Sequence, residues 1–391
     1  MMRVRLGCLL ACLVLGATVA APVVAQSQLT LDYSAIAKAL VRQLALRPGE
    51  RVLSVAHPGL FEGLLPHIRY EVMRAGGIDL GVIDVLPEPV PDSWDLGAIQ
   101  KAARDARPYY KAMLEGVDAA IMMPGATPAH PVYAAMQDWL KEGRGRTVHF
   151  HWLENGSAYT LPGQPLPGRP AIDALYQKAL IETDYRALAD IERRFAEAMR
   201  GQEIHITSPA GTDLRFRIGD RPVNRQDGDA SAARTSQGVI LIDREVELPA
   251  GAIRVAPLEE TVDGSIAFPT SQWDGRPADG LVLRFAKGRV VEVRATVGKD
   301  AVEAEIARAG DAGRSFREFA LGFNPLLVVP PRMPWIPYYG YGAGVVRLSL
   351  GDNSELGGKV GGGYVRWNFF TDLTVSVGST VWVKDGVLQV K

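Results

Sequence analysis

The chain has 391 residues, with 43 Lys and Arg against 44 Asp and Glu, and 47% of its residues are hydrophobic. This near-neutral balance excludes the strongly basic surface that is typical of proteins binding nucleic acid or anionic membranes. The length is sufficient for two domains, each with a hydrophobic core of its own.

Residues 1–25 are typical of a secretory signal. Arg3 and Arg5 form a short basic start, and a continuous stretch of apolar and small residues follows over 6–21. Residues 23–25 (Val-Val-Ala) place small side chains where signal peptidase requires them, so we expect export to the periplasm or the medium. A membrane anchor is the alternative, although the apolar stretch is short for a span of about 20 residues.

Both cysteines, Cys8 and Cys12, lie inside this predicted signal. After its removal the chain would have no disulfide, no cysteine nucleophile and no cysteine-ligated zinc. No long apolar run follows the signal, so we expect no membrane contact by the exported protein.

Residues 26–200 predict an open α/β domain of Rossmann type. Helix-length segments separate short runs with the pattern of buried strands, which argues for parallel βαβ units. No G-x-G-x-x-G turn follows a strand, so we do not expect a dinucleotide site. The predicted strands are 51–56, 78–85, 117–123 and 147–152, and the clearest helices are 33–46, 61–75 and 185–199.

Residues 201–391 predict a second, β-rich α+β domain. Asp and Gly turns separate its strand-like runs, and one helix over 300–310 interrupts them. The predicted strands are 203–207, 213–218, 238–242, 252–256, 281–285, 289–296, 344–350, 364–370, 372–377 and 380–383.

Short motifs follow one another in this second half. They are SPAGTDL at 208–214, LPAG at 248–251, APLE at 256–259, EFALGFNP at 318–325, LGDN at 350–353 and DG at 385–386. Together with LRPGERV at 46–52, they resemble peptidase family M29, the leucyl aminopeptidase or aminopeptidase T-like proteins. The resemblance implies a β-rich domain of M29 type, two divalent ions of zinc, cobalt or manganese, and metal-dependent release of N-terminal amino acids from peptides.

The resemblance also implies positions for the metal ligands. They fall at Ala252, Glu318, Arg347, Arg366 and Asn368, and the chain has no histidine after residue 205. Only Glu318 is a good metal ligand, because Arg is a permanent cation that only donates hydrogen bonds and Asn offers a neutral carbonyl oxygen. We therefore expect a divergent member that lacks the dinuclear site and needs no metal cofactor.

Two roles are open to Arg347 and Arg366. They could form buried ion pairs with Glu318 or a nearby Asp, or they could bind a carboxylate or phosphate of a ligand. Tyr341 lies in an aromatic, Gly-rich segment (334–342) that could line a cavity, form a subunit contact or pack under a loop. The ion-pair role is the favoured one for the two arginines, and Arg347, Arg366, Glu318 and Tyr341 are the candidates for ligand binding.

Other candidates are weaker. His149 and His151 form an H-x-H pair at a predicted strand end, which is a metal spacing but lacks an evident third donor. Acidic turns at 227–229 and 259–263 could join Glu318 in an oxygen-only calcium site, although solvated turn acids are the favoured explanation.

Three hypotheses follow for the function. The preferred one is an exported pseudo-enzyme that binds a peptide or small anion, without a nucleic-acid partner. The second is an active leucyl-type metallo-aminopeptidase with a remodelled metal site, and the third is another enzyme on the same scaffold. Ring-cleaving iron dioxygenases resemble the family too, but they also use His and Asp ligands. The resemblance further implies a homodimer formed through the C-terminal domain.

Overall fold

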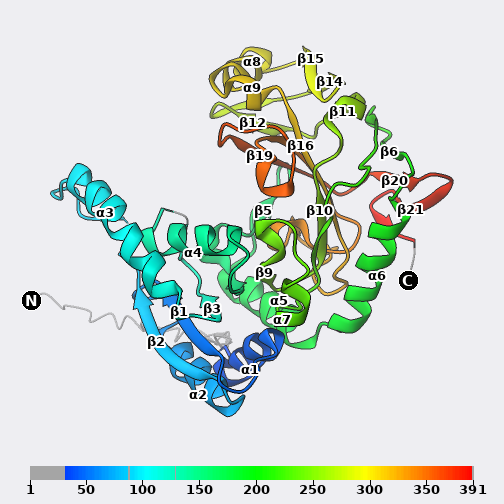
Figure 1. Cartoon of the computed structure of the whole chain (residues 1–391). Helices are drawn as coiled ribbons and strands as arrows, with labels where there is room; N and C mark the ends of the chain where they lie inside the picture. The colour runs from blue at the N-terminus through cyan, green and yellow to red at the C-terminus, as the bar shows by residue number, and fades with distance from the viewer. Residues whose placement is uncertain (1–30, 87–88, 128, 390–391) are drawn as a thin grey trace, which may run out of the picture.

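The computed structural model describes residues 31–86, 89–127 and 129–389, and the predicted secretory signal lies outside them. In Figure 1 the N-terminal half surrounds one parallel sheet and the C-terminal half is built mainly of strands. None of the helices in the described ranges is long and apolar enough to span a membrane.

The N-terminal sheet has five parallel strands in the order β2-β1-β3-β4-β9. Its last strand lies well beyond residue 200, so the chain crosses the expected domain boundary and returns to complete the first sheet. Val246 and Leu248 of this strand are buried, which explains the return. The bounds are β1 (Arg51–Ala56), β2 (Ile78–Asp84), β3 (Ala119–Met122), β4 (Thr147–Phe150) and β9 (Glu245–Leu248).

The described part of the N-terminal half also contains six α-helices, and three of them begin at aspartate caps. The Asp32 carboxylate accepts from the backbone N–H of Ala35 at the start of α1, and Asp95 and Asp184 cap α3 and α6 in the same way. Such caps satisfy backbone donors that have no partner inside the helix. The bounds are α1 (Tyr33–Leu44), α2 (Leu65–Arg74), α3 (Leu96–Leu114), α4 (Pro131–Lys141), α5 (Arg169–Glu182) and α6 (Tyr185–Ala198).

The C-terminal half contains two larger antiparallel sheets. One has the order β19-β18-β16-β10-β8, and the other has the order β15-β14-β11-β7-β6-β20-β21-β22. The bounds of the first sheet are β8 (Asn224–Gln226), β10 (Ala252–Val255), β16 (Phe316–Gly322), β18 (Val346–Gly351) and β19 (Val365–Phe370). Those of the second are β6 (Ile204–Thr207), β7 (Asp213–Phe216), β11 (Asp263–Ala267), β14 (Val282–Ala286), β15 (Arg289–Arg294), β20 (Thr374–Val377), β21 (Thr380–Lys384) and β22 (Val387–Leu388).

Smaller elements complete the chain. Two strand pairs stand apart from the main sheets, and three further helices lie in the second half. They are β5 (Tyr159–Thr160) with β17 (Trp335–Ile336), β12 (Ser271–Trp273) with β13 (Arg276–Ala278), α7 (Ala232–Thr235), α8 (Lys299–Arg308) and α9 (Gly310–Gly313).

The strand predicted over 238–242 is wrong. These residues form a bend that enters a 3-10 turn over Leu241–Asp243, and the strand begins only afterwards, at Glu245. The carboxylate of Asp243 accepts the backbone N–H groups of Val239 and Ile240. A local acceptor of this kind competes with the ladder of a sheet.

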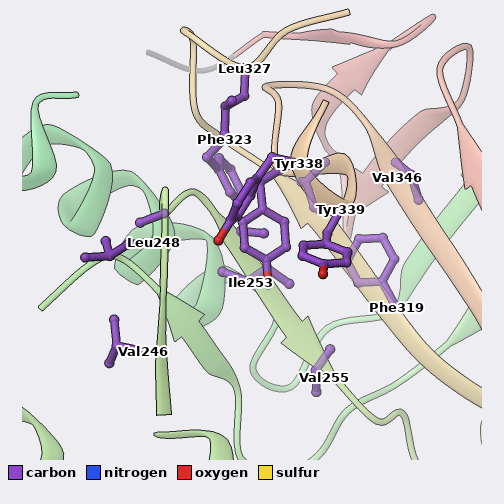
Figure 2. Close-up of a cluster of buried hydrophobic side chains, with 14 of the residues drawn as sticks. Val246, Leu248, Ile253, Val255, Phe319, Phe323, Leu327, Tyr338, Tyr339 and Val346 are labelled. Atoms are coloured by element: carbon purple, nitrogen blue, oxygen red, sulfur yellow. The ribbon is translucent and has the colours of Figure 1, made fainter. Parts of the chain in front are cut away.

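One continuous core joins the two halves. Figure 2 shows Val246 and Leu248 of β9 near Ile253 of β10, with Tyr338 and Tyr339 beside them. All four residues of β10 are buried, so this strand is covered on both faces.

A buried carboxyl group on α6 gives the fold a pH dependence. Glu192 has no exposed surface, and neither carboxyl oxygen has a hydrogen-bond partner among the described residues. Burial, and then the negative charge of Asp227, raises the pKa of Glu192 well above its ordinary value of 4.5. The folded protein keeps this proton where the unfolded chain has lost it, so its contribution makes stability fall as pH rises above about 4.5.

Glu192→Leu should therefore stabilise the protein at pH 8 by about 1–3 kcal/mol, because a buried unsatisfied polar group disappears. The gain should shrink as pH approaches 4, and urea unfolding at several pH values would measure it. Glu197→Leu, on the exposed face of the same helix, is the matched control. An equal loss of stability at every pH in Glu192→Leu would contradict this assignment.

Candidate ligand site

Glu318 lies at the centre of the five-stranded antiparallel sheet and has no exposed surface. It stands on β16 and pairs with Ser349 of β18. On either side of the same strand, Arg254 of β10 and Arg347 of β18 both lie opposite Ala320. Because residues two apart on a strand share a face, these arginines and Glu318 lie on one face of the sheet.

Each carboxylate oxygen of Glu318 has a cationic partner. Arg347 Nε donates to Oε1 at 2.9 Å, and Ser349 Oγ donates to the same oxygen at 3.1 Å. Arg254 Nη2 donates to Oε2 at 3.1 Å, and Arg317 Nε lies 3.8 Å from that oxygen. Glu318 is therefore fully engaged by protein donors.

A second glutamate, Glu355, extends this group. It accepts from Arg254 Nη2 at 2.7 Å and also from Arg317, and its side chain is 41% exposed. We call Arg254, Arg317, Glu318, Arg347 and Glu355 the Glu318 cluster. Three guanidinium groups against two carboxylates leave it a formal charge of +1.

The opposite charges within this cluster shift the pKa values of Glu318 and Arg254. Burial alone would raise the pKa of Glu318, but Arg254, Arg347 and Arg317 outweigh burial and hold the pKa well below its usual range. Burial likewise opposes the charged form of Arg254, yet Glu318 and Glu355 raise its pKa well above the ordinary value. Glu318 and Arg254 are therefore both charged at neutral pH.

A second buried group lies on the parallel sheet. His149 on β4 has its Nδ1 3.0 Å from Glu245 Oε1 of β9, and the hydroxyl of Tyr133 donates to the same carboxylate. The ring of His151 stacks on that of His149 with centroids 3.7 Å apart. Burial, and then the neighbouring His149, lowers the pKa of His151 well below its ordinary value.

Two tyrosines lie between the two groups. The hydroxyl of Tyr341 donates to Glu247 of β9, and the electrostatic fields of Glu247 and Arg254 both act on it. Tyr341 is 1% exposed, so the aromatic segment around it packs in the interior. The direct contacts between the groups pass through Tyr339, because Arg347 Nη1 donates to the Tyr339 carbonyl at 3.2 Å and the Tyr339 hydroxyl lies 3.4 Å from His151 Nδ1.

These residues do not fit a pair of divalent metal ions. Glu318, the one ligand retained at the predicted positions, is surrounded by guanidinium groups, which are permanent cations. Within the ranges that the structure describes, no group of three or more His, Cys, Asp or Glu is arranged to hold a metal. Ala252 is buried on β10 and supplies only a methyl group there.

Arg366 pairs with Glu305, so the expectation that it pairs with Glu318 or a nearby Asp is wrong. Its Nη1 lies 2.7 Å from Glu305 Oε1, its Nη2 donates to the carbonyl of Gln272, and its guanidinium stacks over Trp273 at 3.4 Å. It takes the predicted ion-pair role, but with a different acid.

The strand register explains this difference. Trp367 lies opposite Ser349, so it shares a face with Glu318, while Arg366 and Asn368 point to the other face of β19. The amide of Asn368 donates to the backbone carbonyl of Leu348. The residues of β19 that face the Glu318 cluster are therefore aromatic.

Sequence reasoning missed several members of the site. Arg254, Arg317 and Glu355 belong to no motif that was matched, and Glu245 and Glu247 lie just before one. A signal for Arg254 was present, since it is a lone charge in an otherwise apolar strand, two residues after Ala252. A charge in such a position requires a buried partner.

A pocket of about 630 Å³ lies next to the Glu318 cluster, and we call it the β19 pocket. Trp367 lies between this pocket and Arg347, with its ring 4.9 Å from the guanidinium carbon. Phe369 packs against Tyr159 with ring centroids 4.3 Å apart. The lining comes from residues 158–166, 268–272, 336 and 366–369.

Part of the chain matches a family model, and the fold as a whole matches solved structures. Residues 185–326 match the family model described as Thermophilic metalloprotease (M29). Wild-type AmpT from Thermus thermophilus aligns with a TM-score of 0.58 and 17% identity, covering 92% of this chain and 99% of its own. The structure of 2,5-dihydroxypyridine dioxygenase from Pseudomonas putida KT2440 aligns with a TM-score of 0.62 and 12% identity, covering 92% of this chain and 97% of its own. No curated protein matches the chain.

At identities of 12% and 17%, the two structures show only that the fold is shared. They cover both halves of this chain, and the predicted combination of an open α/β domain with a β-rich α+β domain is confirmed. The predicted resemblance to M29 is confirmed as well.

Glu318→Gln should destabilise the fold by about 3–5 kcal/mol, because three buried guanidinium groups would lose their shared counter-charge. The pKa of Glu318 is depressed on folding, so its contribution is present above the ordinary value of 4.5 and is lost as pH falls. Denaturant unfolding between pH 3 and 8 measures both effects.

The matched control is Glu292→Gln, which breaks an exposed pair with Arg284 at 3.1 Å. It should change stability by less than about 1 kcal/mol. A similarly small change in Glu318→Gln would show that Glu318 does not hold the arginines in place.

Proposed function

We propose that this chain is a divergent member of peptidase family M29, a ligand-binding relative of the metallo-aminopeptidases that works without their dinuclear metal site. The observation that carries the proposal is the Glu318 cluster, in which guanidinium groups surround the one retained ligand. It favours a pseudo-enzyme over a peptidase.

The family's reaction requires metal ions, and this requirement explains why the Glu318 cluster argues against peptide hydrolysis. Metal-dependent hydrolysis requires several anionic or imidazole donors that fix the metal and acidify a bound water. Arg254 and Arg347 provide neither, and their charge repels a divalent cation placed beside Glu318. Arg317 adds a third positive charge at the same carboxylate.

The same cluster supports the binding of a small anion or of a peptide that carries a carboxylate. Its formal charge is +1, and Arg347 Nη2 is buried without a hydrogen-bond partner among the described residues. A buried unmet donor costs free energy until a ligand or water supplies an acceptor. The β19 pocket reaches within one aromatic layer of this nitrogen, at Trp367.

An active aminopeptidase with a remodelled metal site is the alternative. His149, His151, Glu245 and Glu247 lie on neighbouring strands, and His149 Nε2 is buried without a hydrogen-bond partner in the described part of the chain. His149 and Glu245 are hydrogen-bonded to each other, and this arrangement favours a structural network over a metal site.

Purified protein should contain only substoichiometric zinc, cobalt and manganese, and it should not hydrolyse leucyl p-nitroanilide with or without these metals. Elemental analysis and an absorbance assay measure the two quantities. Tightly bound stoichiometric metal together with chelator-sensitive turnover would refute the pseudo-enzyme proposal.

We also propose export, as the sequence of residues 1–25 predicts, and a homodimer, as the resemblance to M29 implies. Mass spectrometry of the protein from the periplasm or medium should find a new N-terminus at Gln26. Retention of residues 1–25 there would contradict cleavage, and light scattering of purified protein would test the dimer.

A further inference from the structure

We propose that the outer edge of β19 binds an extended peptide main chain inside the β19 pocket. This inference deepens the proposed function, because it names the class of ligand and the way in which the ligand is held. It rests on that function only in requiring that the peptide is bound and not cleaved.

The first support is an unpaired strand edge. β19 is the last strand of its sheet, and no described residue pairs with its outer side. A strand edge presents a row of N–H and C=O groups that another strand can complete. Peptides that add to a sheet in this way obtain affinity from main-chain hydrogen bonds.

The hydrogen-bond pattern between β18 and β19 determines which backbone N–H and C=O groups of β19 point outward. Asp352 N–H donates to the carbonyl of Tyr364 at 2.7 Å, directly before β19. In an antiparallel pair, hydrogen-bonded and non-bonded positions alternate, so Arg366 and Asn368 direct their backbone groups toward β18. The backbone N–H and C=O groups of Trp367 therefore point outward, as do those of the other odd-numbered residues of β19.

The second support is the shape of the pocket. Four consecutive residues, Arg366 to Phe369, line it. Successive side chains point to opposite faces of a strand, so a pocket lined by all four must run along the edge. The opposite walls come from residues 158–166 and 268–272, and the volume of about 630 Å³ is within the usual range of ligand pockets. In Figure 1, β5 of this wall lies near β19.

The side chains around the edge favour an uncharged, partly apolar peptide segment there, so a carboxylate of the ligand would belong to the part near Arg347 and not to the part held at β19. Arg366 is already engaged by Glu305 and by the carbonyl of Gln272, so it does not require a ligand charge. Trp367 is 37% exposed, and Phe369 is half-buried beside it. These rings offer contacts to alternate side chains of an added strand, and the main chain supplies the hydrogen bonds.

The test uses fluorescent pentapeptides with blocked ends that alternate Val, Leu or Phe with Thr. Anisotropy should show saturable binding to the full protein by at least one peptide. The same peptide with its two β19-facing amides N-methylated should bind at least about tenfold more weakly, because two main-chain donors are lost. Equal affinity of the methylated peptide, or no binding of the whole set up to ~1 mM, would overturn the inference.

A matched pair of variants tests how much the outward backbone N–H of Trp367 contributes to peptide binding. Trp367→Pro and Trp367→Ala both remove the indole, but only proline removes the outward N–H, and edge strands tolerate proline. Trp367→Pro should bind at least a few-fold more weakly than Trp367→Ala. If the proline variant does not fold, as judged by circular dichroism, the comparison of the methylated and unmethylated peptides still tests the inference.

Two outcomes separate this inference from the proposed function. Shortening of an unblocked peptide by chelator-sensitive turnover would refute the pseudo-enzyme, while the blocked peptides could still report binding at β19. A concentration-dependent dimer that Trp367→Pro disrupts and Trp367→Ala does not, without peptide binding, would assign the edge to a second copy and overturn the inference.

Discussion

The charge of Glu318 is the constraint on which the rest of the site depends. A carboxylate without exposed surface is tolerated only when opposite charges and hydrogen bonds replace its hydration. Arg254 and Arg347 come from the strands on either side, so the two pairs hold three strands in register. The present packing does not fit a divalent cation at this carboxylate, because guanidinium groups already donate to both of its oxygens.

The packing around this charge joins the two halves of the molecule. β9 leaves the second half of the sequence to complete the parallel sheet, and its Glu247 accepts from Tyr341 of the segment before β18. The aromatic side chains of this segment fill the space between the sheets, as Figure 2 shows for Tyr338 and Tyr339. The ion pairs of the C-terminal sheet are thereby connected to the His149 network.

Much of this could be predicted from the sequence. The order of motifs indicated the family, and the alternation of strands and helices indicated the fold of both halves. The position of Arg347 beside Glu318 followed from its motif. Arg366 was placed wrongly because a shift of one residue along a strand exchanges its two faces, and pattern matching does not fix the register of an edge strand.

The partners of Glu318 were harder to predict for another reason. Arg254 and Glu355 are separated by about a hundred residues in the chain, and only the folded sheet brings them into contact. Strand β9 was missed because the more apolar run just before it, over 238–242, was predicted as the strand. Contacts made by tertiary packing leave little trace in a local pattern.

The most direct test of the central claim is a crystal structure determined after soaking in zinc or manganese, with anomalous scattering recorded. We predict no anomalous peak within coordination distance of Glu318, and guanidinium nitrogens of Arg254 and Arg347 about 3 Å from its oxygens. A metal peak bound by Glu318, with either arginine displaced, would contradict the account.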